Sequence, residues 1–82
     1  MLILYVSTGC PFCAKVLETG RELGIEFDVR DILQNPEYEE ELIEKGGKPQ
    51  TPFLVDEEHS TLLYESDVII DYLHQQFGNK TV

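Results

Sequence analysis

The stretch Gly9-Cys10-Pro11-Phe12-Cys13 holds both cysteines of the 82-residue chain, three positions apart. It follows the apolar run 1–6, which is typical of a strand buried on both faces of a sheet. Pro11 stands where a helix begins, at the position that tolerates a missing N–H group. Cys10 is therefore expected at the N-cap of a helix, with Cys13 one turn further along the same face. Two thiols where a strand passes into a helix indicate thiol–disulfide chemistry.

The start of a helix favours an ionised thiol at Cys10. Unpaired backbone N–H groups and the helix dipole point toward a side chain at this position, and both stabilise a thiolate. Such surroundings lower the pKa of a cysteine from about 8.5 to roughly 3.5–7.5. We therefore interpret Cys10 as the nucleophile and Cys13, which lies deeper, as the resolving thiol. Pro11 keeps the helix start rigid, and Phe12 covers it with an apolar side chain.

Two other uses of the cysteine pair have to be weighed. A structural zinc site takes four ligands, usually from two such pairs. The further candidates, His59 and His74, lie far apart without ligand spacing, so we expect no metal. The second alternative is that both cysteines are inert members of the core. The position of the pair between a strand and a helix favours redox chemistry over both alternatives.

The charge of the chain argues against several classes of partner. Six Lys and Arg against sixteen Asp and Glu give a net charge of −10, which makes nucleic acid and anionic membrane surfaces poor partners. The acidity serves either solubility or the selection of partners with basic surfaces. The apolar run 1–6 is too short for a membrane span and lacks the basic start of a signal peptide. We therefore expect a cytoplasmic protein in a reducing compartment.

Hydrophobic periodicity and turn residues predict the element order β-α-β-α-β-β-α. The first β-α-β unit forms a right-handed crossover between parallel strands, and the last two strands form an antiparallel hairpin. The expected strands are 1–6, 25–30, 51–55 and 59–64, and the expected helices begin at Pro11, at Pro36 and, capped by Ser66, near residue 66. The helices are expected to bury Cys13, Val16 and Leu17; Tyr38, Leu42 and Ile43; and Ile69, Ile70, Leu73 and Phe77.

Two motifs together resemble a known family. The stretch Cys10-Pro11-Phe12-Cys13 after a short apolar strand, with Thr51-Pro52 before a later strand, resembles the glutaredoxins of the thioredoxin-fold superfamily. The resemblance extends from Leu2 to about Phe77. The segment 64–73, which contains Glu65-Ser66-Asp67, is similar to the Glu-Ser motif of the N-terminal domain of glutathione S-transferases. These resemblances imply one α/β domain spanning residues 1–82, with a mixed four-stranded sheet flanked by helices in the thioredoxin fold.

The resemblance also implies a glutathione site. Pro52 would be a cis-proline beside the cysteines, and the backbone of Thr51 would pair with the cysteinyl unit of glutathione. Ser66 would bind the γ-glutamyl carboxylate at a helix N-terminus, and Asp67 and Glu65 would face the γ-glutamyl ammonium. Lys48 would meet the glycyl carboxylate. Each position also has an ordinary structural interpretation: Thr51-Pro52 as a strand start, Ser66 as a plain N-cap, and Lys48 as a solvated loop lysine.

One position departs from the family pattern. Many glutaredoxins carry a lysine three residues before the first cysteine, where this chain has Ser7. The change removes a positive charge that would stabilise the thiolate and attract glutathione. Lys15 is expected to point along the helix and away from Cys10.

The function that we expect is glutathione-dependent thiol–disulfide oxidoreduction by a monomer through Cys10 and Cys13. Its partners would be glutathione, as co-substrate, and proteins that carry disulfides or mixed disulfides with glutathione. Two alternatives stay open: an electron donor recycled by a thioredoxin reductase, and a glutathione- or iron–sulfur-binding module without catalysis.

Overall fold

The computed structural model describes residues 2–78 and confirms the predicted order of elements. The elements are β1 (Leu2–Val6), α1 (Pro11–Glu22), β2 (Phe27–Asp31), α2 (Pro36–Gly46), β3 (Phe53–Asp56), β4 (Thr61–Tyr64) and α3 (Ser66–Phe77). The four strands form one sheet in the order β2-β1-β3-β4. Strand β1 runs parallel to β2 and antiparallel to β3, and β3 and β4 form the antiparallel hairpin.

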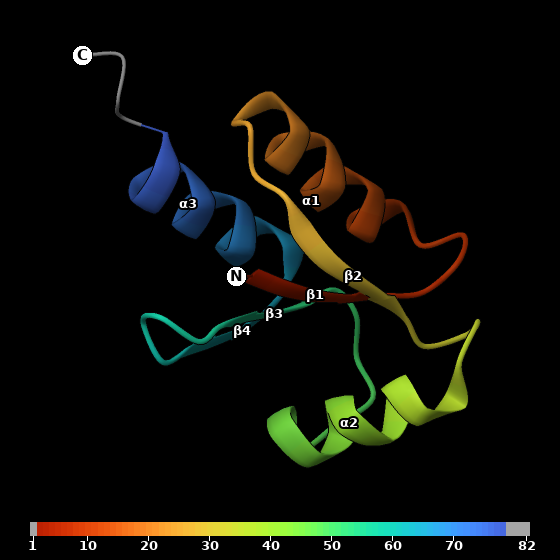
Figure 1. Cartoon of the computed structure of the whole chain (residues 1–82). Helices are drawn as coiled ribbons and strands as arrows, with labels where there is room; N and C mark the ends of the chain where they lie inside the picture. The colour runs from red at the N-terminus through yellow and green to blue at the C-terminus, as the bar shows by residue number, and fades with distance from the viewer. Residues whose placement is uncertain (1, 79–82) are drawn as a thin grey trace.

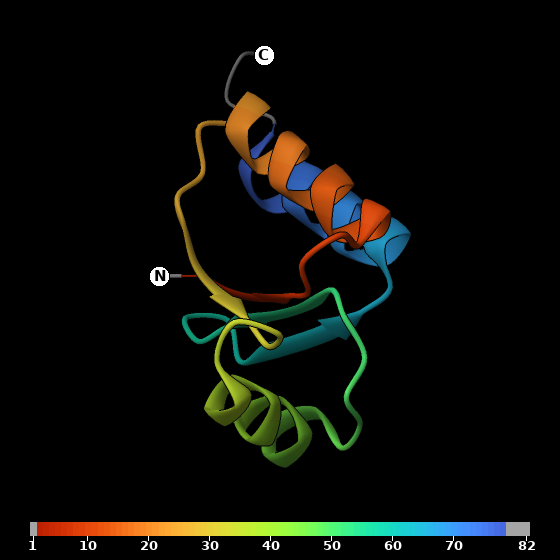
Figure 2. The same cartoon turned by 90° about the vertical axis from the view of Figure 1, so that its right-hand side faces the viewer.

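The helices cover the two faces of the sheet unequally. Helices α1 and α3 lie side by side on one face, and α2 alone covers the other (Figures 1 and 2). The arrangement is the mixed four-stranded, three-helix α/β architecture of a thioredoxin-like fold, as predicted.

Strand β1 separates two hydrophobic cores. All five of its residues are buried, as the unbroken apolar run predicts. Leu2, Leu4 and Val6 join the core beneath α1 and α3, together with Cys13, Val16, Leu54, Ile69 and Leu73. Ile3 and Tyr5 join the core beneath α2, together with Ile32, Leu42, Phe53 and Val55. Because successive side chains of a strand point to opposite faces, one apolar strand supplies both cores.

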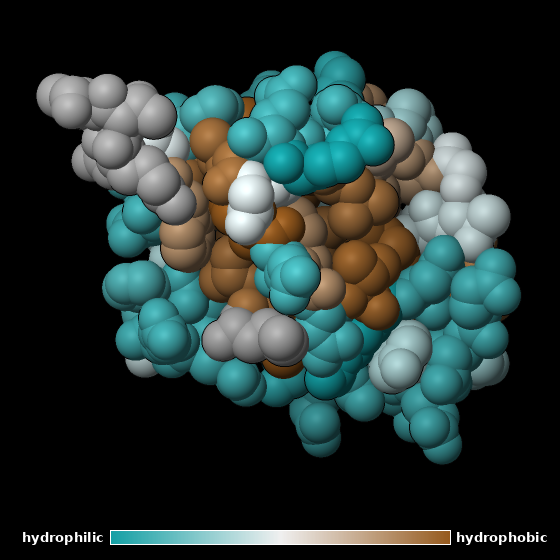
Figure 3. Space-filling model, turned by 45° about the horizontal axis from the view of Figure 1, so that its top comes forward, coloured by the Kyte–Doolittle hydropathy of each residue, from teal (hydrophilic) through white to brown (hydrophobic). Residues whose placement is uncertain are grey.

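The helical face formed by α1 and α3 leaves apolar side chains only partly covered. Leu17, Leu23, Ile25, Ile70 and Phe77 pack against the core from its edge without being fully buried. Figure 3 views this face and shows apolar surface gathered over the helices within a polar rim. None of the helices within residues 2–78 is both long and apolar enough to cross a membrane.

Several expected boundaries differ from the structure, one expected core residue is exposed, and four others are only half-buried: Leu17, Tyr38, Ile70 and Phe77. Strand β2 begins at Phe27, not at residue 25, and β4 begins at Thr61, not at residue 59. Ile43 was expected to be buried, and this is wrong, because its side chain is 42% exposed. Only Leu42 of α2 is buried, so this acidic helix contacts the sheet along a stripe too narrow to include the adjacent position.

A polar cluster ties α2 to the sheet. Arg30 on β2 donates to the Glu41 carboxylate on α2 at 2.7 Å and to Asp28 at 2.9 Å. The hydroxyl of the fully buried Tyr5 donates to the same Glu41 oxygen at 3.0 Å. Glu41 therefore joins α2 to two strands through charge-assisted hydrogen bonds.

We expect Glu41→Ala to lower the free energy of unfolding by about 1 kcal/mol, because Arg30 and Tyr5 both lose an acceptor in a partly exposed site. The matched control is Glu40→Ala, since Glu40 is exposed on the same helix and the change in helix propensity is identical. Urea denaturation measures both. Equal losses in the two variants would show that the cluster adds nothing to stability.

A second polar cluster joins the β3–β4 hairpin to α3. The carboxylate of Asp56 at the end of β3 is only 2% exposed, and it accepts hydrogen bonds from the Tyr72 hydroxyl and from His59 Nδ1, the latter at 2.7 Å. Burial alone would raise the pKa of Asp56, but the hydrogen bonds from Tyr72 and His59 outweigh burial and lower it. Folding therefore favours the ionised carboxylate.

A pH dependence of stability follows from this lowered pKa. The contribution of Asp56 is present above the carboxyl's ordinary pKa and is lost as pH falls through the lowered value. We expect Tyr72→Phe to destabilise the protein by about 1–3 kcal/mol near pH 7 and by less as pH approaches about 3. Urea denaturation at a series of pH values measures this, with Tyr38→Phe as the control for loss of a hydroxyl outside the cluster. A pH-independent difference would contradict the assignment.

Candidate active site

The two cysteines lie where β1 passes into α1, at the carboxyl end of the central strand. Cys10 is the N-cap of α1, with an extended backbone (φ −82°, ψ 113°), and Pro11 is the first helical residue. The Cys13 backbone N–H donates to Cys10 Sγ at 3.3 Å, and the Cys10 N–H donates to the Ser7 carbonyl at 3.1 Å. Both cysteines are free thiols, Cys10 half-buried and Cys13 buried. The predicted placement of the pair is therefore confirmed.

The surroundings shift the pKa values of the two thiols in opposite directions. Burial opposes ionisation of Cys10, but hydrogen bonds from the Cys13 thiol, the backbone N–H groups of Cys13 and Phe12, and the Thr51 hydroxyl together lower its pKa. For Cys13, burial and its hydrogen bond to Cys10 raise the pKa to about 11. One thiol is thus prepared to react as a thiolate, while its neighbour stays protonated.

This difference predicts selective alkylation. We expect iodoacetamide, added in limited amount near neutral pH, to modify Cys10 first, because the thiolate is the reacting form and Cys10 is the more exposed thiol. The rate should rise with pH through the lowered pKa of Cys10. Peptide mapping by mass spectrometry identifies the modified residue. Equal modification of both cysteines, or faster modification of Cys13, would contradict this assignment.

The Thr51-Pro52 segment lies beside the cysteines, just before β3. Its peptide bond is cis, as the resemblance implied, and Pro52 is buried. Thr51 lies outside the strand, which begins at Phe53 and not at residue 51 as expected. The Thr51 hydroxyl lies 3.0 Å from the Ser7 hydroxyl.

The start of α3 lies close to Thr51-Pro52. Ser66 is only 8% exposed and is the first residue of the helix. The expectation that Ser66 is the N-cap is wrong: Glu65 occupies the N-cap position with φ +72°, and its side chain makes no capping hydrogen bond. A non-glycine residue in this left-handed region is uncommon and is worth noting beside a candidate site.

A pocket of about 240 Å³ joins these segments. Its lining residues are Phe12, Gln50, Thr51, Pro52, Glu65, Ser66 and Asp67. Most of the residues predicted to hold glutathione therefore meet in one place. The pocket reaches the first turn of α1, which follows Cys10 and contains Cys13, through Phe12, whose side chain is 55% exposed.

Lys48 is not among the lining residues of this pocket. Its ammonium lies 4.9 Å from the centre of the Tyr64 ring, and its carbonyl accepts a hydrogen bond from the Tyr64 hydroxyl at 2.7 Å. Gln50, which was not predicted as a site residue, lines the pocket instead. The signal available in the sequence was its position directly before Thr51-Pro52. Lys15 lies with its ammonium 5.7 Å from the centre of the Phe12 ring.

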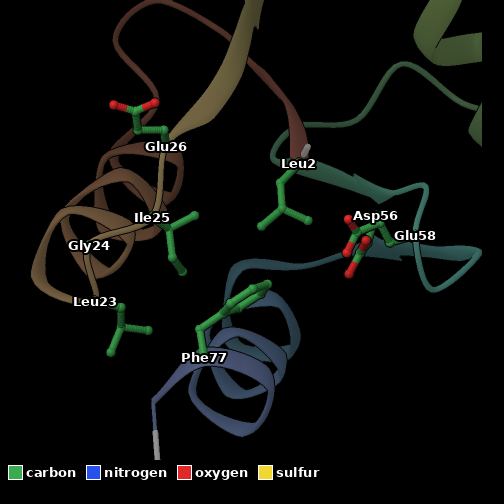
Figure 4. A pocket seen from close by; sticks show the side chains of 8 residues that line it. All are labelled: Leu2, Leu23, Gly24, Ile25, Glu26, Asp56, Glu58 and Phe77. Carbon is green, nitrogen blue, oxygen red and sulfur yellow. The ribbon is translucent and has the colours of Figure 1, made fainter. Parts of the chain in front are cut away.

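A second cavity, of about 280 Å³, lies at the other end of β1 and contains no thiol. Figure 4 shows Leu2, Ile25 and Phe77 pointing toward one another, with the Asp56 and Glu58 carboxylates at one side. Leu2 begins β1, whereas the segment that leads to Cys10 follows Val6, the last residue of β1. Asp56 already accepts hydrogen bonds from Tyr72 and His59, so we assign the chemistry to the pocket beside the cysteines.

Residues 2–78 bring no three His, Cys, Asp or Glu side chains together in a group that would hold a metal ion. The expectation of a metal-free protein stays a prediction.

The comparisons with known proteins agree on one family. The sequence model described as the N-terminal domain of glutathione S-transferase matches residues 4–81. No curated protein matches the sequence. Among solved structures, a glutathione S-transferase from the Antarctic clam Laternula elliptica is 29% identical, with a TM-score of 0.80 over 95% of this chain and 36% of its own.

Two further structures extend the comparison. An unclassified glutathione S-transferase from Bombyx mori is 25% identical, with a TM-score of 0.81 over 96% of this chain and 37% of its own. A glutathione transferase from Phanerochaete chrysosporium, in complex with oxidized glutathione, is 25% identical, with a TM-score of 0.77 over 95% of this chain and 37% of its own. The chain thus spans little more than a third of the length of the structures it matches.

Proposed function

The chain belongs to the family of glutathione S-transferase N-terminal domains, and we propose that it is a glutathione-dependent thiol–disulfide oxidoreductase of the glutaredoxin type. The observation that carries the proposal is the Cys10 sulfur at the start of α1, which accepts the Cys13 N–H at 3.3 Å and has a lowered pKa. A nucleophilic thiolate with a second thiol one helical turn away is the arrangement that disulfide exchange requires.

The pocket beside the cysteines supports glutathione as the partner. Thr51 precedes β3, so its backbone groups are available to an extended peptide such as the cysteinyl unit. Ser66 and Asp67 open α3, where N–H groups receive a carboxylate, and Glu65 and Asp67 provide negative charge for an ammonium. The structure of the related transferase from Phanerochaete chrysosporium was solved in complex with oxidized glutathione.

Gln50 takes the position in the pocket that we expected for Lys48. In this proposal, the Gln50 amide donates a hydrogen bond to glutathione where a lysine would contribute a charge. This uncharged contact would hold the glycyl carboxylate less tightly than an ion pair.

The proposed reaction with a glutathionylated protein has two exchanges. The Cys10 thiolate attacks the glutathione sulfur, the mixed disulfide bond breaks, and the protein leaves as a thiolate while glutathione stays on Cys10. A second glutathione thiolate then attacks the sulfur of the bound glutathione, which releases glutathione disulfide and restores the Cys10 thiolate. The cycle consumes one free glutathione, whose sulfur is oxidised as the protein sulfur is reduced, and the other half of the glutathione disulfide comes from the substrate.

A protein disulfide takes a different second step. Cys10 forms a mixed disulfide with one protein sulfur and releases the other as a thiolate. Cys13 then attacks Cys10, which releases the second protein thiolate and closes a Cys10–Cys13 disulfide. We place this chemistry in a reducing cytosol, with the protein acting as a monomer.

We expect Cys10→Ser to abolish the reduction of a glutathionylated peptide, because the nucleophile is lost. Cys13→Ser should retain this activity and lose the reduction of protein disulfides, since only the second route needs a resolving thiol. The measurement is a coupled assay with glutathione, glutathione reductase and NADPH. Equal loss in both variants would contradict the roles of the two cysteines.

Glutathione binding is measured separately by calorimetry on the Cys10→Ser protein. Binding to this variant together with turnover by the wild type supports the proposal. Binding without wild-type turnover would identify a binding module, and reduction of the wild-type protein only by a thioredoxin reductase would identify an electron donor of another kind.

A further inference from the structure

The Ser7 and Thr51 hydroxyls are brought together by the pairing of β1 with β3. In the antiparallel register Tyr5 lies opposite Phe53. Continuing that register past the end of the ladder by two residues brings Ser7 opposite Thr51, and their hydroxyl oxygens are 3.0 Å apart. The contact is partly buried and joins positions 44 residues apart in the sequence.

Both residues also interact with Cys10. The Ser7 carbonyl accepts a hydrogen bond from the Cys10 N–H at 3.1 Å, so Ser7 fixes the backbone of the N-cap residue. Hydrogen bonding by the Thr51 hydroxyl lowers the pKa of the Cys10 thiol and of the Cys13 thiol, and its single hydrogen is donated to one sulfur at a time. When Cys10 is a thiolate, its sulfur can only accept, so Thr51 donates to it. The Thr51 oxygen is then free to accept from the Ser7 hydroxyl.

We propose that Ser7 is a positioning residue, which orients the Thr51 hydroxyl so that it donates to the Cys10 sulfur. The inference rests on the proposed function, in which Cys10 is the nucleophile. Hydrogen bonds in series polarise one another, so the Ser7 donor strengthens the bond from Thr51 to sulfur. Ser7 and Thr51 together stabilise the thiolate with uncharged groups, and Ser7 stands where many glutaredoxins carry a lysine.

Charged side chains from three neighbouring elements also lie at this end of the molecule. Asp31 at the end of β2 accepts a hydrogen bond from Thr8, the residue after Ser7. Lys15 on α1 lies over the Phe12 ring, and Glu65 and Asp67 at the start of α3 line the neighbouring pocket. The hydrogen bonds that favour the Cys10 thiolate come from backbone N–H groups, the Cys13 thiol and the Thr51 hydroxyl. Removal of one hydroxyl is therefore expected to change the ionisation of Cys10 measurably.

The test is the pH dependence of Cys10 alkylation by iodoacetamide, followed by mass spectrometry in Ser7→Ala, Thr51→Val and the double variant. We expect each single variant to slow alkylation about threefold to tenfold near pH 6, with a higher apparent pKa, since one hydrogen bond of about 1 kcal/mol is lost or weakened. The double variant should be no slower than Thr51→Val alone, because Ser7 acts through Thr51.

Two controls separate positioning from packing. Thr51→Ser keeps the hydroxyl and should keep the wild-type profile, whereas a loss as large as that of Thr51→Val would overturn the proposal. Thr8→Ala removes a neighbouring hydroxyl that donates to Asp31 at 2.7 Å, and it should leave Cys10 alkylation unchanged. Circular dichroism melting checks that each variant is folded.

Two further results would overturn the proposal: an unchanged pH profile in Ser7→Ala, or losses in the two single variants that add in the double variant. Alkylation needs neither glutathione nor a disulfide substrate. Failure of this inference is therefore distinguishable from failure of the proposed oxidoreductase function, which the coupled assay tests.

Discussion

The burial of β1 on both faces is the constraint on which the rest of the structure depends. Leu4 and Tyr5 are fully buried on opposite faces, so the strand is held in place by both cores at once. The loop that carries Cys10 begins where this strand ends, and β3, paired beside it, carries Thr51-Pro52 to the same end. The geometry of the candidate site is therefore set by backbone pairing, which makes it a rigid support for thiol chemistry.

Local signals in the sequence predicted most of the fold and the positions of both cysteines. The apolar run before Ser7, the prolines at helix starts and the hairpin pattern of strand, turn and strand act over a few residues, so each element could be predicted without its neighbours. The position of Cys10 at the helix N-cap and of Cys13 in the core followed from the same signals. These features needed no knowledge of long-range contacts.

The remaining features depend on contacts between distant segments. Glu65, not Ser66, is the N-cap of α3, because the chain leaves β4 with a left-handed residue before the helix. Lys48 contacts Tyr64, and Gln50 lines the pocket instead, since the direction of each side chain in the loop before β3 is set by packing. The contact between Ser7 and Thr51 required the register of β1 and β3. None of these is encoded in a short motif.

The buried position of Cys13 has a kinetic consequence for the proposed cycle. With a pKa of about 11, only about one Cys13 in 10⁴ is a thiolate at neutral pH. Burial, the largest cause, persists when Cys10 carries glutathione, whereas the hydrogen bond to the Cys10 thiolate and the repulsion from it are then gone. Burial therefore continues to oppose ionisation of Cys13 in the proposed cycle, in which free glutathione competes with Cys13 for the adduct on Cys10. The partition between the two routes would then depend on how much free glutathione surrounds the protein.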